Sequence, residues 1–282
     1  MHSNTPIGLL LQQGLQARGE GRHAAAQAAC TEVLRREPEQ PDALHLLAEL
    51  AQAQGRLAAA EALLGRALCA SPARAQAWFR LGDVQEDLGR LDEAQRSLRR
   101  AFELKPDHVE ALYNHARLQR LLSRPEDAAA SLQRALQIGA GAPTLRAQML
   151  QLRALLQEEA GQIELALATL ELALALAPGR AALHHNRGVL LQRLARPGEA
   201  LAAHDQALAL GLQAADAHYN RGNSLQSLGR SSEALAAYRA ALAREPQQAA
   251  INDFFAELKT KNERLVYIES HADVESDEAL AA

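Results

Sequence analysis

The sequence predicts an all-α protein, an α-α superhelix built from repeated helix pairs. Three observations predict this fold: the composition, a spacing of 34 residues that recurs along the chain, and apolar residues at helical spacing. The chain of 282 residues is rich in Ala, Leu, Arg, Gln and Glu, which favour helices, and only 3% of its residues are aromatic. Since strands favour aromatic and β-branched residues, an all-β fold is excluded and a mixed α/β fold is disfavoured.

Charge and cysteine content exclude several classes of function. Lys and Arg total 30 and Asp and Glu total 34, which gives a net charge of −4. This charge disfavours a protein that binds nucleic acid and one that binds a membrane through a polybasic segment, because both need an excess of basic residues. Cys30 and Cys69 are too few for a disulfide framework or a thiolate metal site. The N-terminal sequence lacks the basic region of a secretory signal, and no stretch approaches the length of an apolar membrane span. We therefore expect a cytoplasmic protein without a membrane segment.

Prolines mark the repeat most plainly, because steps of 34 residues lead from Pro38 to Pro72 and from Pro72 to Pro106. The same step links Ala94 to Ala128. Aligning the chain in this register gives seven repeats, at residues 7–40, 41–74, 75–108, 109–142, 147–180, 181–214 and 215–248. One helix pair cannot bury its apolar face alone, so the repeats are expected to stack on one another.

Each repeat predicts two helices joined by a short turn. Positions 4, 8 and 11 of a repeat lie on one face of the first helix, and positions 20, 24 and 27 on one face of the second. In the third repeat the first of these faces carries Trp78, Gly82 and Gln85, which we expect in the core. Small residues at positions 8 and 20 let the two helices approach closely. Glycine at position 15 ends the first helix, and proline at position 32 ends the second.

This pattern resembles the tetratricopeptide repeat family, and the resemblance covers about 85% of the chain. The third repeat matches the family signature at Trp78, Gly82, Gly89, Ala94, Leu98, Ala101 and Pro106. The resemblance implies a non-catalytic scaffold that binds a protein or peptide segment in the concave groove of the superhelix. It implies no cofactor.

Three departures from the signature concern helix ends. Ser123 and Ala195 stand where glycine is usual at position 15. Four extra residues, beginning at Pro143, precede the fifth repeat and are about one helical turn. They either lengthen its first helix at the N-terminus or form a longer loop. Pro197 suits the first turn of a helix.

Both ends of the chain fall outside the repeats. Residues 1–6 are expected to be disordered, residues 249–268 to form a capping helix over the last repeat, and residues 269–282 to form an acidic disordered tail. The apolar face of the capping helix carries Ile251 and Phe255. Residues 265–268, LVYI, are either the end of this helix or a strand that opens a further domain.

In the family the concave groove is lined mainly by positions 2, 5, 6, 9, 12 and 13 of the first helices. Position 6 carries Asn114, Asn186 and Asn220, which resemble the asparagine ladders of helical solenoids that hold the main chain of an extended peptide. Leu152 interrupts this series. Other groove positions complete the predicted binding surface with Phe79, Arg80, Tyr113, Arg117, His185, Tyr219 and Asn223. The alternative is that the asparagines only provide a polar, solvated lining to an open groove.

No catalytic, nucleotide-binding or metal-binding motif is present in the sequence. We therefore expect neither an enzyme nor a metal protein, and His184 and His218 are expected to be packing residues. Two alternatives to the scaffold remain open. The chain could be the substrate-recruiting region of a glycosyltransferase, methyltransferase or hydroxylase, since bacterial chains with similar Asn186-Arg187-Gly188 repeats are often built that way. It could also self-associate through the open ends of its superhelix.

Overall fold

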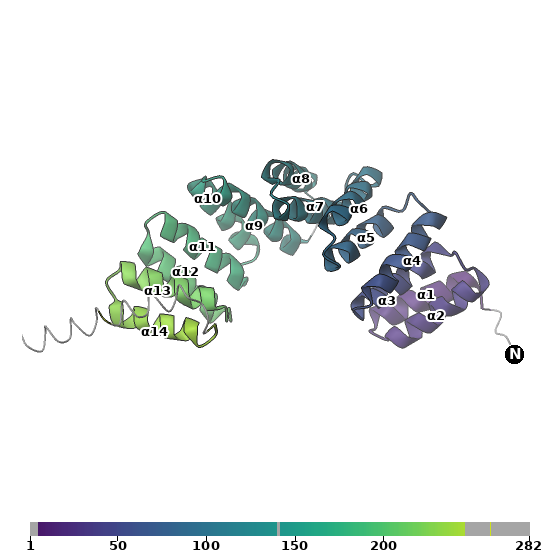
Figure 1. Cartoon of the computed structure of the whole chain (residues 1–282), viewed down its shortest axis with the longest axis horizontal. Helices are drawn as coiled ribbons and strands as arrows, with labels where there is room; N and C mark the ends of the chain where they lie inside the picture. Colours follow the sequence, from purple (N-terminus) through teal and green to yellow (C-terminus); the bar gives the residue numbers. More distant parts are fainter. Residues whose placement is uncertain (1–4, 140–141, 246–259, 261–282) are drawn as a thin grey trace, which may run out of the picture. The chain divides into compact units, whose positions relative to one another are not determined.

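The computed structural model describes residues 5–139, 142–245 and 260, and every regular element in these ranges is an α-helix (Figure 1). The helices form consecutive pairs. The first helices of the pairs are α1 (Ile7–Gly19), α3 (Pro41–Ala53), α5 (Ala75–Asp87), α7 (Val109–Leu121), α9 (Pro143–Glu159), α11 (Ala181–Arg193) and α13 (Ala215–Ser227). The second helices are α2 (His23–Arg36), α4 (Leu57–Ala70), α6 (Leu91–Leu104), α8 (Pro125–Ile138), α10 (Ile163–Leu176), α12 (Pro197–Ala209) and α14 (Ser231–Leu242). The predicted all-α fold of stacked helix pairs is confirmed.

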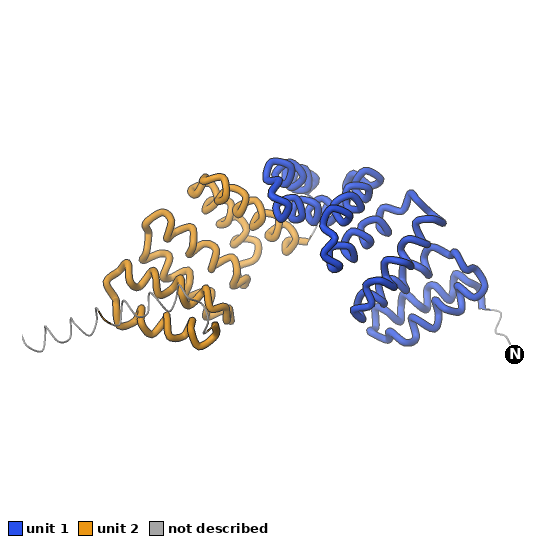
Figure 2. Tube along the Cα trace, in the orientation of Figure 1, with its two compact units in different colours: residues 1–141 blue, residues 142–282 orange. Residues whose placement is uncertain are grey.

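The chain divides into two compact units, shown in Figure 2. The N-terminal unit, residues 1–141, holds the pairs from α1–α2 to α7–α8, and the C-terminal unit, residues 142–282, holds those from α9–α10 to α13–α14. Inside each unit the second helix of one pair packs on the first helix of the next, as α4 does on α5 and α12 does on α13. The division falls beside the four extra residues that precede the fifth repeat.

Glycine at position 8 lets the second helix of a pair place a large side chain against the backbone of the first. A Cβ added to Gly82 would lie 2.7 Å from Leu98 Cγ, and one added to Gly222 would lie 2.6 Å from Tyr238 Cε1. Leu98 and Tyr238 both stand at position 24, and both are fully buried. The side chain at position 24 therefore packs into the space that the glycine at position 8 of the same repeat leaves open.

The turns inside the pairs use the left-handed backbone conformation that position 15 requires. The glycines there have φ of 72° to 77°, and they are Gly21, Gly55, Gly89, Gly161 and Gly229. Ser123 adopts φ 57° and Ala195 φ 54°, although neither is glycine. The repeat geometry therefore imposes a conformation that an L-residue with a Cβ adopts at a cost.

The four extra residues of the fifth repeat lengthen its first helix. α9 begins at Pro143 and has 17 residues, against 13 in the other first helices. The longer-helix alternative is confirmed, with Pro143 in the first turn, where its missing N–H is no loss. Pro197 likewise begins α12.

Trp78 lies at the edge of the core rather than inside it, which corrects the sequence-based assignment. It is half-buried between two apolar clusters, and its indole Nε1 donates a hydrogen bond of 2.8 Å to the Pro72 carbonyl oxygen. A fully buried position would leave this N–H without a partner, which explains the edge position. His184, at the same position of its repeat, bonds the Pro178 carbonyl at 2.8 Å. The prediction that His184 is a half-buried packing residue is confirmed.

The C-terminal predictions fall outside the described residues. Of the capping helix, the tail and the LVYI segment, the structure describes position 260 alone. Their conformations stay predictions.

Candidate binding surface on the first helices

The ten residues predicted to line the groove all lie on first helices. Five are in the N-terminal unit, on α5 and α7, and five in the C-terminal unit, on α11 and α13. The structure brings them together within each unit. Their hydrogen-bond states differ between the units.

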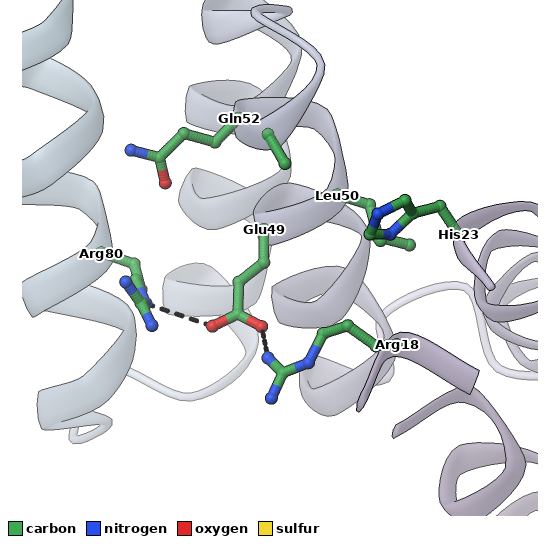
Figure 3. A pocket seen from close by; sticks show the side chains of 7 residues that line it. Arg18, His23, Glu49, Leu50, Gln52 and Arg80 are labelled. Atoms are coloured by element: carbon green, nitrogen blue, oxygen red, sulfur yellow. Dashed lines mark hydrogen bonds and ion pairs between the residues drawn. The ribbon is translucent and has the colours of Figure 1, made fainter. Parts of the chain in front are cut away.

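A chain of ion pairs crosses the first helices of the N-terminal unit (Figure 3). The Glu49 carboxylate lies between two guanidinium groups, paired with Arg18 through Oε2 and with Arg80 Nε through Oε1 at 3.1 Å. His45 Nε2 approaches the same carboxylate at 3.6 Å. Burial alone would raise the pKa of Glu49, but His45 and the two arginines outweigh it and lower the pKa to about 2.

The next link of this chain joins α5 to α7. Asn114 Nδ2 donates a hydrogen bond of 2.9 Å to Asp83 Oδ1, and Arg117 Nη2 pairs with Glu86 Oε2 at 2.5 Å. Burial raises the pKa of Asp83 to about 6, despite the bond from Asn114 and the Arg80 guanidinium 3.6 Å away. Three of the predicted groove residues, Arg80, Asn114 and Arg117, are therefore already engaged within the protein.

The four of these contacts that join neighbouring first helices obey one spacing rule. The partners Arg18 and Glu49 are 31 residues apart, and so are Asp83 and Asn114. A separation of 31 is one repeat of 34 less three residues, so it joins the next first helix about one turn back towards its start. In repeat terms, position 9 meets position 6 of the next repeat, and position 12 meets position 9.

A pocket of about 360 Å³ opens beside this ion-pair chain (Figure 3). The residues around it are Arg18, His23, Glu49, Leu50, Gln52, Ala53 and Arg80. Gln52 is bonded to Asp87 at 2.8 Å. Because the charged groups around the pocket are paired with one another, a ligand there would have to displace an internal partner.

The aromatic residues predicted in this unit differ in exposure. Phe79 is only 8% exposed and belongs to the core, where its ring centroid lies 4.8 Å from that of His108. Little of the Phe79 ring is therefore accessible to a partner. Tyr113 is half-buried and keeps part of its ring at the surface.

The C-terminal unit places His185 and Asn186 on α11, and Tyr219, Asn220 and Asn223 on α13. All five are half-buried. Asn223 Oδ1 accepts a hydrogen bond of 2.7 Å from the Tyr238 hydroxyl, so this amide is already engaged. The side chains of Asn186 and Asn220 make no hydrogen bond to any residue in the described ranges.

The spacing rule explains why these two amides are open. The residues 31 positions before Asn186 and Asn220 are Leu155 and Val189, and both are apolar. Asn114, by contrast, meets the carboxylate of Asp83. The same amide at position 6 is therefore occupied or open according to the residue at position 9 of the preceding repeat.

Gln192 is a surface residue that sequence reasoning missed. Its Nε2 donates to the backbone oxygen of Asn220 at 2.5 Å and to Ser224 Oγ at 2.7 Å, which ties α11 to α13 beside the open amides. Glu49 and Asp83 were missed in the same way. A search for polar pairs 31 residues apart would have found Glu49 and Asp83, since both stand at position 9.

Two further properties of the described residues bear on function. Among them, no group of three or more His, Cys, Asp or Glu side chains is arranged to hold a metal ion. In the same part of the chain, no helix has the length and apolar character needed to cross a bilayer.

Models of the tetratricopeptide repeat match residues 17–78, 79–143 and 215–248, which together make up more than half of the chain. No curated protein sequence matches it. Among solved structures, the chain resembles PilF of Pseudomonas aeruginosa with a TM-score of 0.70 and 19% identity, over 79% of this chain and 99% of that one. It resembles YrrB, described as a tetratricopeptide repeat protein with an unusual peptide-binding site, with a TM-score of 0.55 and 18% identity, over 67% and 96% of the two chains.

A third similar structure is a chain of the APC/C hetero-tetramer Cut9–Hcn1, with a TM-score of 0.67 and 16% identity. That match covers 83% of this chain and 48% of the other, so the chain spans about half the length of that relative. At these identities the likeness establishes the fold. The matched repeats and the stacked helix pairs lead to one conclusion: the chain belongs to the tetratricopeptide repeat family, whose fold is typical of protein–protein interaction scaffolds.

Proposed function

We propose that the C-terminal unit binds an extended segment of a partner protein across α11 and α13, with Asn186 and Asn220 holding its main chain. The observation that carries this is that both side chains are half-buried on successive first helices and make no hydrogen bond to a described residue. A primary amide offers both a donor and an acceptor. The two asparagines can therefore bond the N–H and C=O groups of a peptide backbone without reading its side chains.

The N-terminal unit is the weaker candidate for this role. Its corresponding amide, that of Asn114, already donates to Asp83, and Arg117 is paired with Glu86. A partner that used these groups would first have to leave a carboxylate without its internal bonds, at a cost of several kcal/mol for a buried group. We therefore assign the Glu86–Arg117 ion pair and the hydrogen bond from Asn114 to Asp83 to holding neighbouring repeats together.

Two amide bonds are not sufficient for stable binding on their own. Each contributes about 0.5–1.5 kcal/mol net, while a micromolar complex needs about 8 kcal/mol. The half-buried Tyr219 ring on α13 and the half-buried side chain of Val189 on α11 provide additional contact area, and Leu155 adds to it from the preceding first helix, α9. The arrangement fits an extended segment that carries an apolar side chain between its two anchored backbone groups.

The test begins with the full chain as bait and identifies captured proteins by quantitative mass spectrometry. Asn186→Ala with Asn220→Ala should weaken the affinity for a captured partner by about 1–3 kcal/mol in titration calorimetry, since two modest hydrogen bonds are lost. The circular dichroism spectrum and the denaturation midpoint should not change. Asn114→Ala is the matched control in the N-terminal unit and should leave the affinity unaltered.

A second variant tests the same idea without removing an amide. Val189→Asp places a carboxylate 31 residues before Asn220, the relation that joins Asp83 to Asn114. The new carboxylate should occupy the Asn220 amide and weaken partner binding to a similar extent. Full affinity in both variants, with the fold intact, would place the binding surface elsewhere on the protein.

A further inference from the structure

A histidine is sealed into the core of the helix pair whose first helix, α11, carries Asn186. His204 stands at position 24 of its repeat on α12 and is 0% exposed. Its ring fills the hollow over Gly188 on α11, where an added Cβ would lie 2.4 Å from His204 Cε1. Both ring nitrogens lack a hydrogen-bond partner in the described part of the chain. A fully buried imidazole with two unsatisfied nitrogens is an unusual choice at this position.

The other repeats show what the position normally holds. Leu64, Leu98, Leu132 and Leu170 fill it without any polar atom, and all four are buried. Tyr238 fills it in the last repeat, but its hydroxyl has two acceptors within reach: it donates to Asn223 Oδ1 at 2.7 Å, and Gln226 Oε1 lies 3.0 Å away. His204 has no such acceptors.

Asn223 and Gln226 stand at positions 9 and 12 of the last repeat. The residues at the same two positions in the repeat of His204 explain why its ring has no hydrogen-bond partner. Position 9 is Val189, which has no polar atom. Position 12 is Gln192, whose amide nitrogen is turned to Asn220 and Ser224 on α13. Among the described residues, no group is therefore placed to accept a hydrogen bond from an imidazolium at His204.

The charged groups around His204 do not compensate a positive charge either. On α11, His185 lies with its ring centroid 5.3 Å away, and a protonated His185 would repel a second imidazolium. Two ion pairs lie on the exposed side, and in each of them the opposite charges neutralise one another. They are Asp205–Arg221, which links α12 to α13, and Glu171–Arg187, which links α10 to α11. On α13, the Asp216 carboxylate raises the pKa of His185 against the effect of burial, but it is not among the groups that shift the pKa of His204.

We propose that His204 makes the α11–α12 pair an acid-sensitive element, which opens when the imidazole takes up a proton and so separates Asn186 from Asn220. The sealed ring can be protonated readily only after α12 has moved away from α11. The opening itself follows from the packing, and its effect on binding rests on the proposed function. Neutral pH thus favours the closed pair, in which α11 with Asn186 contacts α13 with Asn220.

The direction of the pKa shift agrees with this geometry. Burial, and then the neighbouring His185, lower the pKa of His204 from 6.5 to about 3. The folded pair therefore excludes a proton that the opened pair binds. Stability is complete above pH 6.5 and falls as the pH drops towards 3.

Hydrogen exchange measured by mass spectrometry on the full chain tests the opening without any partner. After correction for intrinsic exchange, protection of α11 and α12 should fall about 30-fold between pH 7.5 and pH 5, from the linkage of one shifted site. Protection of α3 and α4 is the internal reference. His204→Leu, which introduces the residue of four other repeats, should abolish the fall in α11 and α12. His115→Leu is the control histidine in the N-terminal unit and should leave that fall unchanged.

Two hydrogen-exchange results would overturn the proposal: constant protection of α11 and α12 across this pH range, or an equal fall in the His204→Leu variant. Nitrogen-15 NMR of the imidazole adds a measurement on the unaltered protein, in which His204 should stay neutral in the folded state at pH 5. A charged imidazole in the folded protein at that pH would equally reject the idea. Because none of these readouts involves a partner, failure of the proposed function would leave their outcome unaffected.

Discussion

Ser123 and Ala195 hold the left-handed conformation that glycine holds at the same place in the other repeats. For a residue with a Cβ this conformation costs about 1–2 kcal/mol. Glycine removes that strain but loses about 0.5–1 kcal/mol through the greater freedom of the unfolded chain. Ser123→Gly and Ala195→Gly should therefore each stabilise their own unit by about 0.5–1 kcal/mol.

Urea denaturation followed by circular dichroism, with hydrogen exchange to separate the two units, measures this gain. Gly89→Ala tests the reverse change at the same repeat position, where φ is 75°, and should destabilise the N-terminal unit. Gly65→Ala is the matched control inside α4, where an added Cβ meets nothing within 4 Å. It should stabilise, because alanine is the better helix former by about 1 kcal/mol. Equal or lower stability of both glycine variants would refute the assignment of strain to these turns.

Three further predictions concern single contacts. Asp83→Asn should stabilise the N-terminal unit at pH 8, by about 3 kcal/mol at most, and have little effect below pH 4. Burial raises the Asp83 pKa from 3.8 to about 6, so ionisation of this carboxyl opposes folding. Urea denaturation at both pH values measures the difference. Trp78→Phe should lower the free energy of unfolding by about 0.5–1.5 kcal/mol, because the hydrogen bond to the Pro72 carbonyl is lost. Trp78→His should lose less of this bond energy, since its ring can bond that carbonyl as His184 bonds Pro178. Equal stabilities of the two variants would contradict this. Gly222→Ala should destabilise by about 1–3 kcal/mol through contact with the Tyr238 ring, and a double-mutant cycle with Tyr238→Leu should show that the smaller side chain relieves most of this cost.

The sequence was informative wherever the repeat signature constrains a residue by itself. The small residue at position 8 and the left-handed residue at position 15 were predicted because one backbone geometry serves every repeat. The left-handed turns at Ser123 and Ala195 follow the repeat register although the amino acid there is not glycine. Pro143 at the start of α9 was predicted from local chemistry alone, since proline suits the first turn of a helix.

The sequence was less informative about side chains whose surroundings come from another repeat. Phe79 was expected at the surface and Trp78 in the core, yet Phe79 is 8% exposed and Trp78 bonds a carbonyl at the edge. Adjacent helical positions differ by about 100° in direction, so the division between core and surface depends on how the next pair packs. The division of the chain into two compact units depends on contacts in the same way.

The separation of 31 residues shows why a shared signature does not fix a shared function. Signature positions 8, 15 and 24 determine how helices pack within a pair, and they leave positions 6, 9 and 12 free to vary. In the N-terminal unit these positions carry charges and amides that satisfy one another, as Asp83 satisfies Asn114. In the C-terminal unit Leu155 and Val189 precede the asparagines by the same interval and leave their amides open. Asparagine at position 6 is therefore a candidate for binding a partner only when the residue 31 positions earlier cannot bond it. Asn114, Asn186 and Asn220 are alike as residues, and their different preceding neighbours set their different hydrogen-bond states.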